Sequence, residues 1–159
     1  MRHRPRIALA AIATLCAIAS LAGCGIRIPA DPDGTLTGVE GDELHVGISP
    51  DPGLIDVSGA TPTGPLIDLA EGYARTLDAT PTWTVGSEET LVGMLESGDI
   101  DLAVGGFTEK TPWTERAALT RGYANIPGAD GRKLVMLVPL GENAMLSDLE
   151  RFLDEEVGS

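Results

Sequence analysis

Apolar residues along most of the chain recur with the two-residue period of strands or the longer period of helices. Residues 44–48 alternate and predict a strand, whereas the apolar residues from Pro65 to Leu77 fall on one face and predict a helix. Pro65 suits the first turn of that helix, where a backbone N–H has no partner in any case. Residues 49–62, rich in Pro, Gly and Asp, predict a loop between the two elements.

The same alternation of elements continues through the middle of the chain. Residues 80–85 are β-prone and predict a second strand. Ser87, followed by two acidic residues, predicts the start of a second helix, because serine caps helix N-termini and the helix dipole favours acids there. Gly98 predicts the end of this helix, and residues 100–104 predict a third strand that ends at two glycines.

The last elements follow an irregular stretch over residues 107–130. Residues 134–138 form a continuous apolar run, which predicts a strand buried on both faces, and residues 143–156 predict a final helix. A β-α-β-α-β order with short connections is typical of parallel sheets with right-handed crossovers. We therefore predict an α/β fold with three layers and a mostly parallel sheet.

The N-terminus has the pattern of a bacterial lipoprotein signal. Three arginines precede an apolar run over residues 7–22, which as a helix would reach about 24 Å, short of the roughly 30 Å of a bilayer core. This pattern predicts a signal peptide over residues 1–23. The run ends Leu-Ala-Gly-Cys and resembles the lipobox, after which Cys24 would carry lipid. An ordinary signal peptide and a retained transmembrane anchor are the alternatives.

Charge and cysteine content narrow the possible functions. The chain carries 11 Lys+Arg and 24 Asp+Glu, and without residues 1–23 the counts become 8 and 24. Such acidity argues against nucleic acid as a partner and against direct adhesion to anionic lipid, so acyl chains at Cys24 would do the tethering. Cys16 leaves with the signal peptide, and His45 remains as the one histidine. We therefore expect no enzyme active site and no cofactor.

Residues 24–42 carry scattered Pro, Gly and acidic residues without any period. This composition predicts a flexible tether between the membrane and a folded lobe over residues 43–157.

The candidate site lies at the carboxyl ends of the predicted strands, where open parallel sheets bind ligands. The third strand end is the richest, because Gly105 and Gly106 allow backbone N–H groups to approach a ligand. Thr108, Thr111 and Arg116 follow, and a guanidinium can grip a carboxylate with two hydrogen bonds. The alternative is that Arg116 forms an ion pair with Glu115 or Glu109 on the surface.

Three segments, residues 44–51, 63–70 and 98–108, resemble the bacterial extracellular solute-binding proteins of family 3. These are the periplasmic amino-acid-binding components of ABC importers. Residues 111–112 and 115–116 match the two halves of the family's Thr-Pro-Glu-Arg segment, with two residues inserted between them. The resemblance implies a single lobe of a type II periplasmic binding protein-like fold.

The resemblance also implies the roles of particular residues. Thr108, Thr111 and Arg116 match positions that hold the ligand carboxylate, and Asp51 begins a loop that normally offers an aromatic side chain. The inserted Trp113 is either a lid over the site or a packed loop aromatic. The predicted ligand-binding set is Thr108, Thr111, Arg116, Gly106, Phe107, Asp51 and Trp113.

Only ten residues separate Tyr123 from Leu134, which leaves no room for the second lobe of a full family member. A single lobe would leave its ligand half exposed. The resemblance therefore implies a lipid-anchored, extracytoplasmic protein of the cell membrane that binds an amino-acid-like or carboxylate solute weakly or with a partner. That partner would be an ABC permease or another membrane protein. The alternative is a membrane-tethered sensory or interaction module with no transport role.

Overall fold

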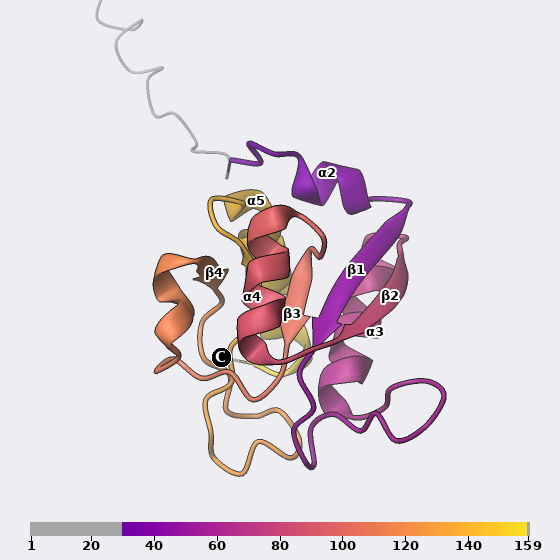
Figure 1. The fold of residues 1–159 in the computed structure, drawn as a ribbon, viewed down its shortest axis with the longest axis vertical. Helices are drawn as coiled ribbons and strands as arrows, with labels where there is room; N and C mark the ends of the chain where they lie inside the picture. The colour runs from indigo at the N-terminus through magenta and orange to yellow at the C-terminus, as the bar shows by residue number, and fades with distance from the viewer. Residues whose placement is uncertain (1–29, 159) are drawn as a thin grey trace, which may run out of the picture.

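The computed structural model describes residues 30–158, so the predicted signal peptide and the lipidation site Cys24 lie outside the described residues. One five-stranded sheet, in the order β2-β1-β3-β5-β4, lies between two layers of helices (Figure 1). The strands are β1 Glu43–Ile48, β2 Thr80–Val85, β3 Leu102–Val104, β4 Ala117–Leu119 and β5 Leu137–Pro139. The helices are α2 Thr35–Val39, α3 Pro65–Thr76, α4 Glu88–Ser97 and α5 Asn143–Glu156, with a 3-10 turn η2 at Pro112–Glu115.

The strand directions confirm the predicted mostly parallel sheet. β1 pairs in parallel with β2 and β3, whereas β5 is antiparallel to β3 and β4. Four strands therefore point the same way, and β5 alone is reversed. The reversal follows from the connection, because the chain from β4 to β5 returns at one edge of the sheet without a crossover helix. The run 134–138 is buried throughout, as predicted, although only its end belongs to β5.

Alternating side chains of the sheet build two apolar clusters, one on each face. Val46 and Ile48 of β1 pack in the larger cluster with α3 and α5. Ala103 and Leu137 pack in the smaller cluster with α4. The layers are thus α3 and α5, the sheet, and α4, which is the predicted three-layer arrangement.

Local signals placed the helix ends correctly. The Ser87 hydroxyl accepts a hydrogen bond from the Thr90 N–H at 3.3 Å, and Gly98 ends α4 in the left-handed conformation. Pro65 begins α3. No helix within residues 30–158 is long and apolar enough to cross a bilayer.

The prediction of irregular chain up to Asp42 is wrong for the segment that includes α2. Val39 is 3% exposed and belongs to the larger apolar cluster. The Ala30 carbonyl accepts a hydrogen bond from the Ala144 N–H of α5 at 2.9 Å. One helical turn gives too short a hydrophobic period to be recognised in the sequence. The chain is therefore attached to the lobe from Ala30 onward.

A buried carboxylate fastens this segment to α5. Glu142 is fully buried, and its two carboxylate oxygens accept hydrogen bonds from the N–H groups of Asp33 (3.0 Å) and Thr35 (3.3 Å). Burial raises the pKa of Glu142, and its hydrogen bond with the Asp31 carboxyl acts in the same direction. Partial burial also acts to raise the pKa of Asp31, but hydrogen bonds from Glu142, Leu36 and Thr37 lower it overall.

The raised pKa of Glu142 predicts a specific pH dependence of stability. Between the pKa of Glu142 in the unfolded chain and its higher folded value, the folded protein holds a proton that the unfolded chain has released. The free energy of unfolding therefore falls as pH rises through this window. We expect the wild type to lose stability relative to the Glu142→Gln variant as the pH rises above 4.5, the ordinary pKa of a glutamate. Urea unfolding of both proteins across this range measures the difference, and a difference independent of pH contradicts the assignment.

Candidate functional site

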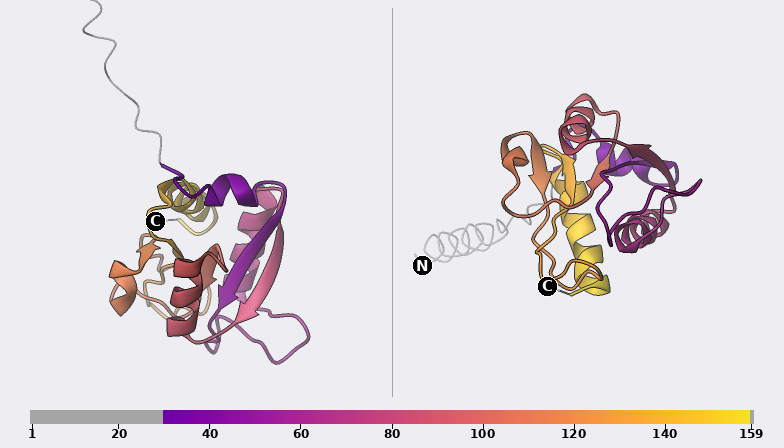
Figure 2. Two further views of the ribbon diagram at one scale, coloured as in Figure 1. Left: turned by 45° about the horizontal axis from the view of Figure 1, so that its top comes forward. Right: turned by 60° about the horizontal axis from the view of Figure 1, so that its bottom comes forward.

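The carboxyl ends of β1, β2 and β3 meet at one edge of the sheet, as predicted. Residues 49–51 follow β1, residues 86–87 follow β2 and residues 105–108 follow β3. The right-hand view of Figure 2 turns this edge toward the viewer. Loops that follow parallel strands at such an edge place polar groups around a ligand.

An ion pair dominates this edge. The Asp51 carboxylate accepts two hydrogen bonds from the Arg132 guanidinium, at 2.9 Å from Nη1 and 3.1 Å from Nη2. Arg132 Nε donates to the Ala129 carbonyl at 3.2 Å, which fixes the orientation of the fork. The side chains are 21% and 35% exposed, so the pair is open to small molecules. The hydrogen bond with Asp51 raises the pKa of Arg132 above its ordinary value.

The glycine turn lies directly beneath this ion pair. A Cβ atom on Gly106 would lie 2.2 Å from Oδ2 of Asp51 and 3.5 Å from Nη1 of Arg132. At Gly105, a Cβ atom would lie 3.0 Å from the Ser49 side chain. The glycines therefore let the Asp51–Arg132 pair pack against the backbone after β3. From the sequence, a ligand was expected to approach the backbone at this place.

Thr108 and Thr111 lie on the segment that leaves this edge. Thr108 forms an isolated bridge with Leu134, and its carbonyl accepts the Thr111 N–H at 2.9 Å. The Thr108 hydroxyl accepts the Lys110 N–H at 3.4 Å. The Thr111 hydroxyl is buried, with no hydrogen-bond partner among the described residues. Both threonines remain candidates for the site, and the solute contact predicted for each is a proposal.

The Phe107 side chain points into the core. It is 1% exposed and packs in the cluster beneath α4, while its carbonyl accepts the Val135 N–H at 3.0 Å. A buried ring cannot contact a solute at the open edge. The predicted role of Phe107 is therefore limited to its backbone.

Trp113 packs against α4. Its indole N–H donates to the Glu88 carboxylate at 3.3 Å, and the Arg116 guanidinium lies 5.6 Å from the centre of its ring. These contacts favour the packed loop aromatic over the lid. They also account for both inserted residues, 113 and 114, as part of the 3-10 turn beside α4.

Arg116 lies at the other end of the sheet from the glycine turn, contrary to the prediction. Its guanidinium forms a two-hydrogen-bond ion pair with Glu96, near the C-terminal end of α4, with Nε at 2.9 Å from the carboxylate. Residue 117 pairs with Pro139, which places Arg116 at the amino ends of the parallel strands. Arg116 thus forms a surface ion pair, but with Glu96 and not with Glu109 or Glu115, the partners considered from the sequence.

Arg132 takes the place that the sequence assigned to Arg116. It lies in the irregular stretch before β5, 81 residues from its partner Asp51. The sequence around Arg132 does not identify it as a site residue, because an isolated arginine in a loop belongs to no hydrophobic period or motif. Its position becomes evident only when the loops after β1 and β3 are seen side by side.

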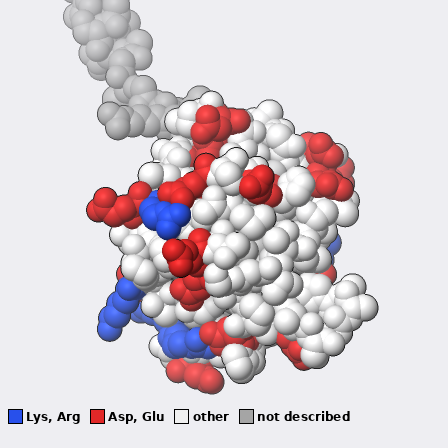
Figure 3. All heavy atoms as spheres, viewed as in Figure 1, with Lys and Arg blue, Asp and Glu red and all other residues white. Residues whose placement is uncertain are grey.

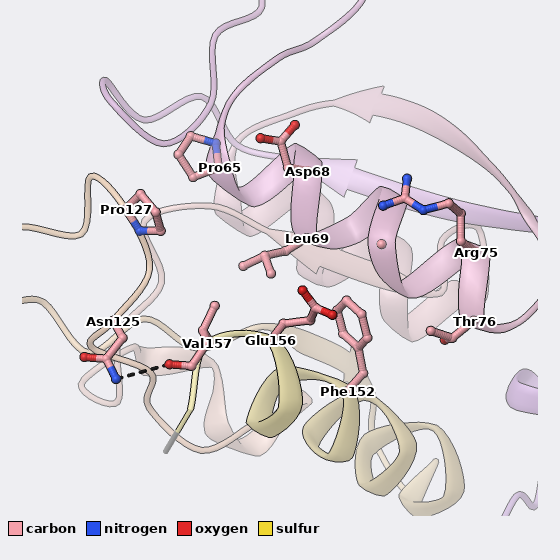
Figure 4. Close-up of a pocket in the computed structure, with 11 residues that line it drawn as sticks. Pro65, Asp68, Leu69, Arg75, Thr76, Asn125, Pro127, Phe152, Glu156 and Val157 are labelled. Carbon is pink, nitrogen blue, oxygen red and sulfur yellow. Dashed lines mark hydrogen bonds between the residues drawn. The ribbon is translucent and has the colours of Figure 1, made fainter.

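A groove of about 830 Å³ between α3 and α5 is the main alternative binding surface (Figure 4). Leu69 and Phe152 lie between the two helices, and Asp68, Arg75 and Glu156 supply its charges. The groove runs along the helical layer and not at the strand ends. Its charged groups come from helix surfaces, where solvated side chains are common.

Acidic side chains are numerous within residues 30–158 but are dispersed (Figure 3). No group of three or more His, Cys, Asp or Glu side chains in this range is arranged to hold a metal ion. Acidic side chains are spread over the face shown in Figure 3, as expected from the net charge of −13.

Comparisons with solved structures identify proteins that share this fold. No protein-family model matches the sequence, and no curated protein matches it. Solved structures do match. A point mutant of the arginine-bound domain 1 of TmArgBP, from T. maritima, has a TM-score of 0.66 at 23% identity, covering 76% of this chain and 96% of that one.

Two further solved structures show the same likeness. An amino acid ABC transporter substrate-binding protein from Streptococcus pneumoniae, bound to L-arginine, has a TM-score of 0.63 at 13% identity, covering 78% of this chain and 93% of that one. A periplasmic binding protein from Salmonella typhimurium with high arginine specificity has a TM-score of 0.61 at 12% identity, covering 74% and 94%. The neighbours are thus amino-acid-binding proteins of the family 3 type, and the described chain has the fold of a single lobe of such a periplasmic binding protein.

Proposed function

We propose that this protein is a solute-binding lobe, anchored by lipid at Cys24 on the extracytoplasmic face of the cell membrane, that serves an ABC transporter. Its solute is amino-acid-like and binds at the Asp51–Arg132 pair. The fold supports solute binding in general. The observation that carries the proposal is the ion pair lying on the glycine turn at the carboxyl ends of the strands.

The chemistry of the pair fits a zwitterion. A guanidinium fork takes a carboxylate through two hydrogen bonds, and a carboxylate takes an ammonium group. An α-amino acid carries both groups a few ångströms apart. It can therefore replace the Asp51–Arg132 ion pair with two new ones, between its carboxylate and Arg132 and between its ammonium group and Asp51. Backbone N–H groups near Gly106 and the Thr108 hydroxyl would then add hydrogen bonds to the solute carboxylate.

Binding by one lobe is expected to be weak. The pair is partly exposed, so a bound solute keeps much of its surface in water. Val85, at the carboxyl end of β2, is 57% exposed, and with Trp83 it lines a small hollow beside this edge. This apolar surface favours a partner that covers the site. It also supports the second candidate function, a membrane-tethered sensory or interaction module.

Amino acids with one charged group blocked test whether the site recognises both the carboxylate and the ammonium group of the solute. We expect α-amino acids to raise the melting temperature, because a solute at ten times its Kd adds about 1.4 kcal/mol of stability, or about 5 °C for a domain of this size. The matching amino acid amides lack the carboxylate, and N-acetyl amino acids lack the ammonium group, so both should give smaller shifts. Equal shifts from blocked and free amino acids contradict the zwitterion site. The absence of any shift across the panel contradicts solute binding by the lobe alone.

The anchor has its own test. Mass spectrometry of the chain purified from bacterial membranes should show residues 24–159 with diacylglycerol on Cys24. A Cys24→Ser variant should be released from the membrane, whereas a Cys16→Ser variant should be processed normally. A chain that keeps residues 1–23 contradicts the proposed processing.

A further inference from the structure

Strand β2 lies at one edge of the sheet, and no other strand among residues 30–158 pairs with its outer side. Its inner neighbour is β1, which runs parallel to it (Figure 1). Thr84 and Val85 are exposed, and Val85 keeps 57% of its surface in contact with water. An uncovered edge of this kind presents backbone N–H and C=O groups that can pair with a further strand.

Hydrogen bonds to β1 show which backbone groups of β2 point outward. The Thr80 N–H donates to the Asp42 carbonyl at 2.8 Å, and the Gly86 N–H donates to the Ile48 carbonyl at 3.1 Å. Backbone groups alternate in direction along a parallel strand, so the even-numbered residues of β2 face β1. The odd-numbered residues therefore direct their N–H and C=O groups away from the sheet.

The open part of this edge is limited to two residues. Pro81 faces outward but has no N–H group to donate. Beyond the strand, Ser87 already serves as the N-cap of α4. Trp83 and Val85 lie between these limits, and each presents an outward N–H and an outward C=O. The edge thus offers a short and well-defined set of donors and acceptors.

This set is complementary to itself across a two-fold axis. In an antiparallel pair of two β2 strands centred on Thr84, Trp83 of each copy would lie opposite Val85 of the other. Opposite residues of this kind exchange both of their N–H···O bonds. All outward groups of Trp83 and Val85 would then be paired, and the next position along the ladder is Pro81, which cannot donate. The register therefore uses every outward donor that β2 has.

The side chains fit the same register. Trp83 packs against the larger apolar cluster, and with Val85 it lines a hollow of about 280 Å³. Residues 83 and 85 point to the same face of the sheet, because side chains alternate along a strand. The indole ring of each copy would therefore lie against Val85 of the other, and an aromatic side chain opposite a β-branched one is a favourable cross-strand pair. The second copy would cover the exposed valine.

The charge distribution favours a meeting of two copies at this edge. The chain carries 24 Asp+Glu and 11 Lys+Arg, so most surfaces of two copies would bring carboxylates together. Residues 79–87, which include β2, contain no charged residue, and neither do residues 57–67, part of which lines the hollow. Edge strands that stay unpaired commonly carry a charge that prevents pairing. β2 lacks this protection.

We propose that two copies of this protein associate through an antiparallel β2–β2 pair centred on Thr84, which joins their sheets into one. The second copy would close the hollow beside the solute site. The paired strands run in opposite directions, so the two solute sites lie at opposite ends of the joint sheet and each Asp51–Arg132 pair stays accessible. The inference depends on neither the lipid anchor nor the solute, and its test needs neither.

Disulfide cross-linking tests the register. The chain from residue 25 onward keeps all the described residues and contains no cysteine. Position 84 of one copy would face position 84 of the other as a non-hydrogen-bonded pair, with Cα atoms about 4.5 Å apart, which a disulfide can span. Thr84→Cys should therefore form a covalent dimer under mild oxidation. Thr82→Cys is the matched control, because its two copies would lie about 13 Å apart along the strands.

Sedimentation of the chain without cysteines tests the association itself. We expect the average mass to rise toward that of a dimer with increasing concentration. Thr84→Lys places two like charges directly opposite each other and should weaken the dimer several-fold. Leu140→Lys adds the same charge at an exposed position outside β2 and should change the dissociation constant by less than about twofold.

Two results would overturn the proposal. A chain that stays monomeric at all concentrations, with no preferential cross-linking at position 84, shows that the edge does not pair with itself and leaves it for a strand of another protein. A dimer that cross-links equally through positions 82 and 84, or that tolerates Thr84→Lys as well as Leu140→Lys, shows that two copies meet through a different surface.

Discussion

Replacing Arg132 with alanine is expected to weaken solute binding by roughly tenfold to a hundredfold, because it removes a two-hydrogen-bond, charge-assisted contact worth about 1.5–3 kcal/mol. Arg132→Lys keeps the charge but loses the planar fork, and should fall between the wild type and the alanine variant. Titration calorimetry with an α-amino acid measures the change in Kd.

Arg116→Ala is the matched control for this prediction. Arg116 is also an arginine in a two-hydrogen-bond ion pair, but its partner Glu96 lies at the other end of the sheet. We expect its Kd to stay within about twofold of the wild-type value, because it makes no contact with the proposed site. A large loss from Arg116→Ala with none from Arg132→Ala would reverse the assignment of the carboxylate-binding residue.

Replacing Gly128 with alanine is expected to destabilise the protein by about 2 kcal/mol more than replacing Gly131. Both glycines have a φ of +80°, so both variants bear the strain of about 1 kcal/mol for a left-handed alanine. A Cβ atom on Gly128 would also lie 2.3 Å from the Gly53 carbonyl oxygen, whereas one on Gly131 would meet nothing within 4 Å. The difference between the variants isolates this backbone clash.

The clash at Gly128 should also disturb the site. Gly128 and Arg132 lie on the same loop, and Gly53 and Asp51 lie on the loop that it contacts. Pushing the loops apart separates the two members of the ion pair, so Gly128→Ala should weaken solute binding and Gly131→Ala should not. Urea unfolding and calorimetry of both variants measure the two effects. Equal stability of the variants contradicts the packing described here.

Local patterns predicted the elements that have strong periods or caps. The helix beginning at Pro65 and the helix from Ser87 to Gly98 were located by apolar spacing and by capping residues, which depend on neighbours in the sequence. The third strand is shorter than predicted, because residues 100 and 101 lie outside the β3 ladder. α2 was missed since a single turn lacks a measurable period, and its position depends on Glu142, more than 100 residues away.

The sequence pointed to this edge of the sheet as the candidate site, but the arginine that lies there is Arg132 and not Arg116. Gly106 and Asp51 lie together as expected, because strand ends follow from topology. The partner of each arginine depends on long-range packing: Arg132 meets a carboxylate 81 residues away, and Arg116 meets one 20 residues away on α4. Sequence spacing cannot decide between two such pairings, since both arginines lie in loops without a period.

An NMR titration tests the central claim most directly. Backbone amide signals of the soluble chain from residue 25 onward, recorded with increasing amounts of an α-amino acid, report where the solute binds. The account predicts shifts at Asp51, Gly106, Thr108 and Arg132, with little change along the groove between α3 and α5. Shifts confined to that groove, at Leu69 and Phe152, would contradict the account.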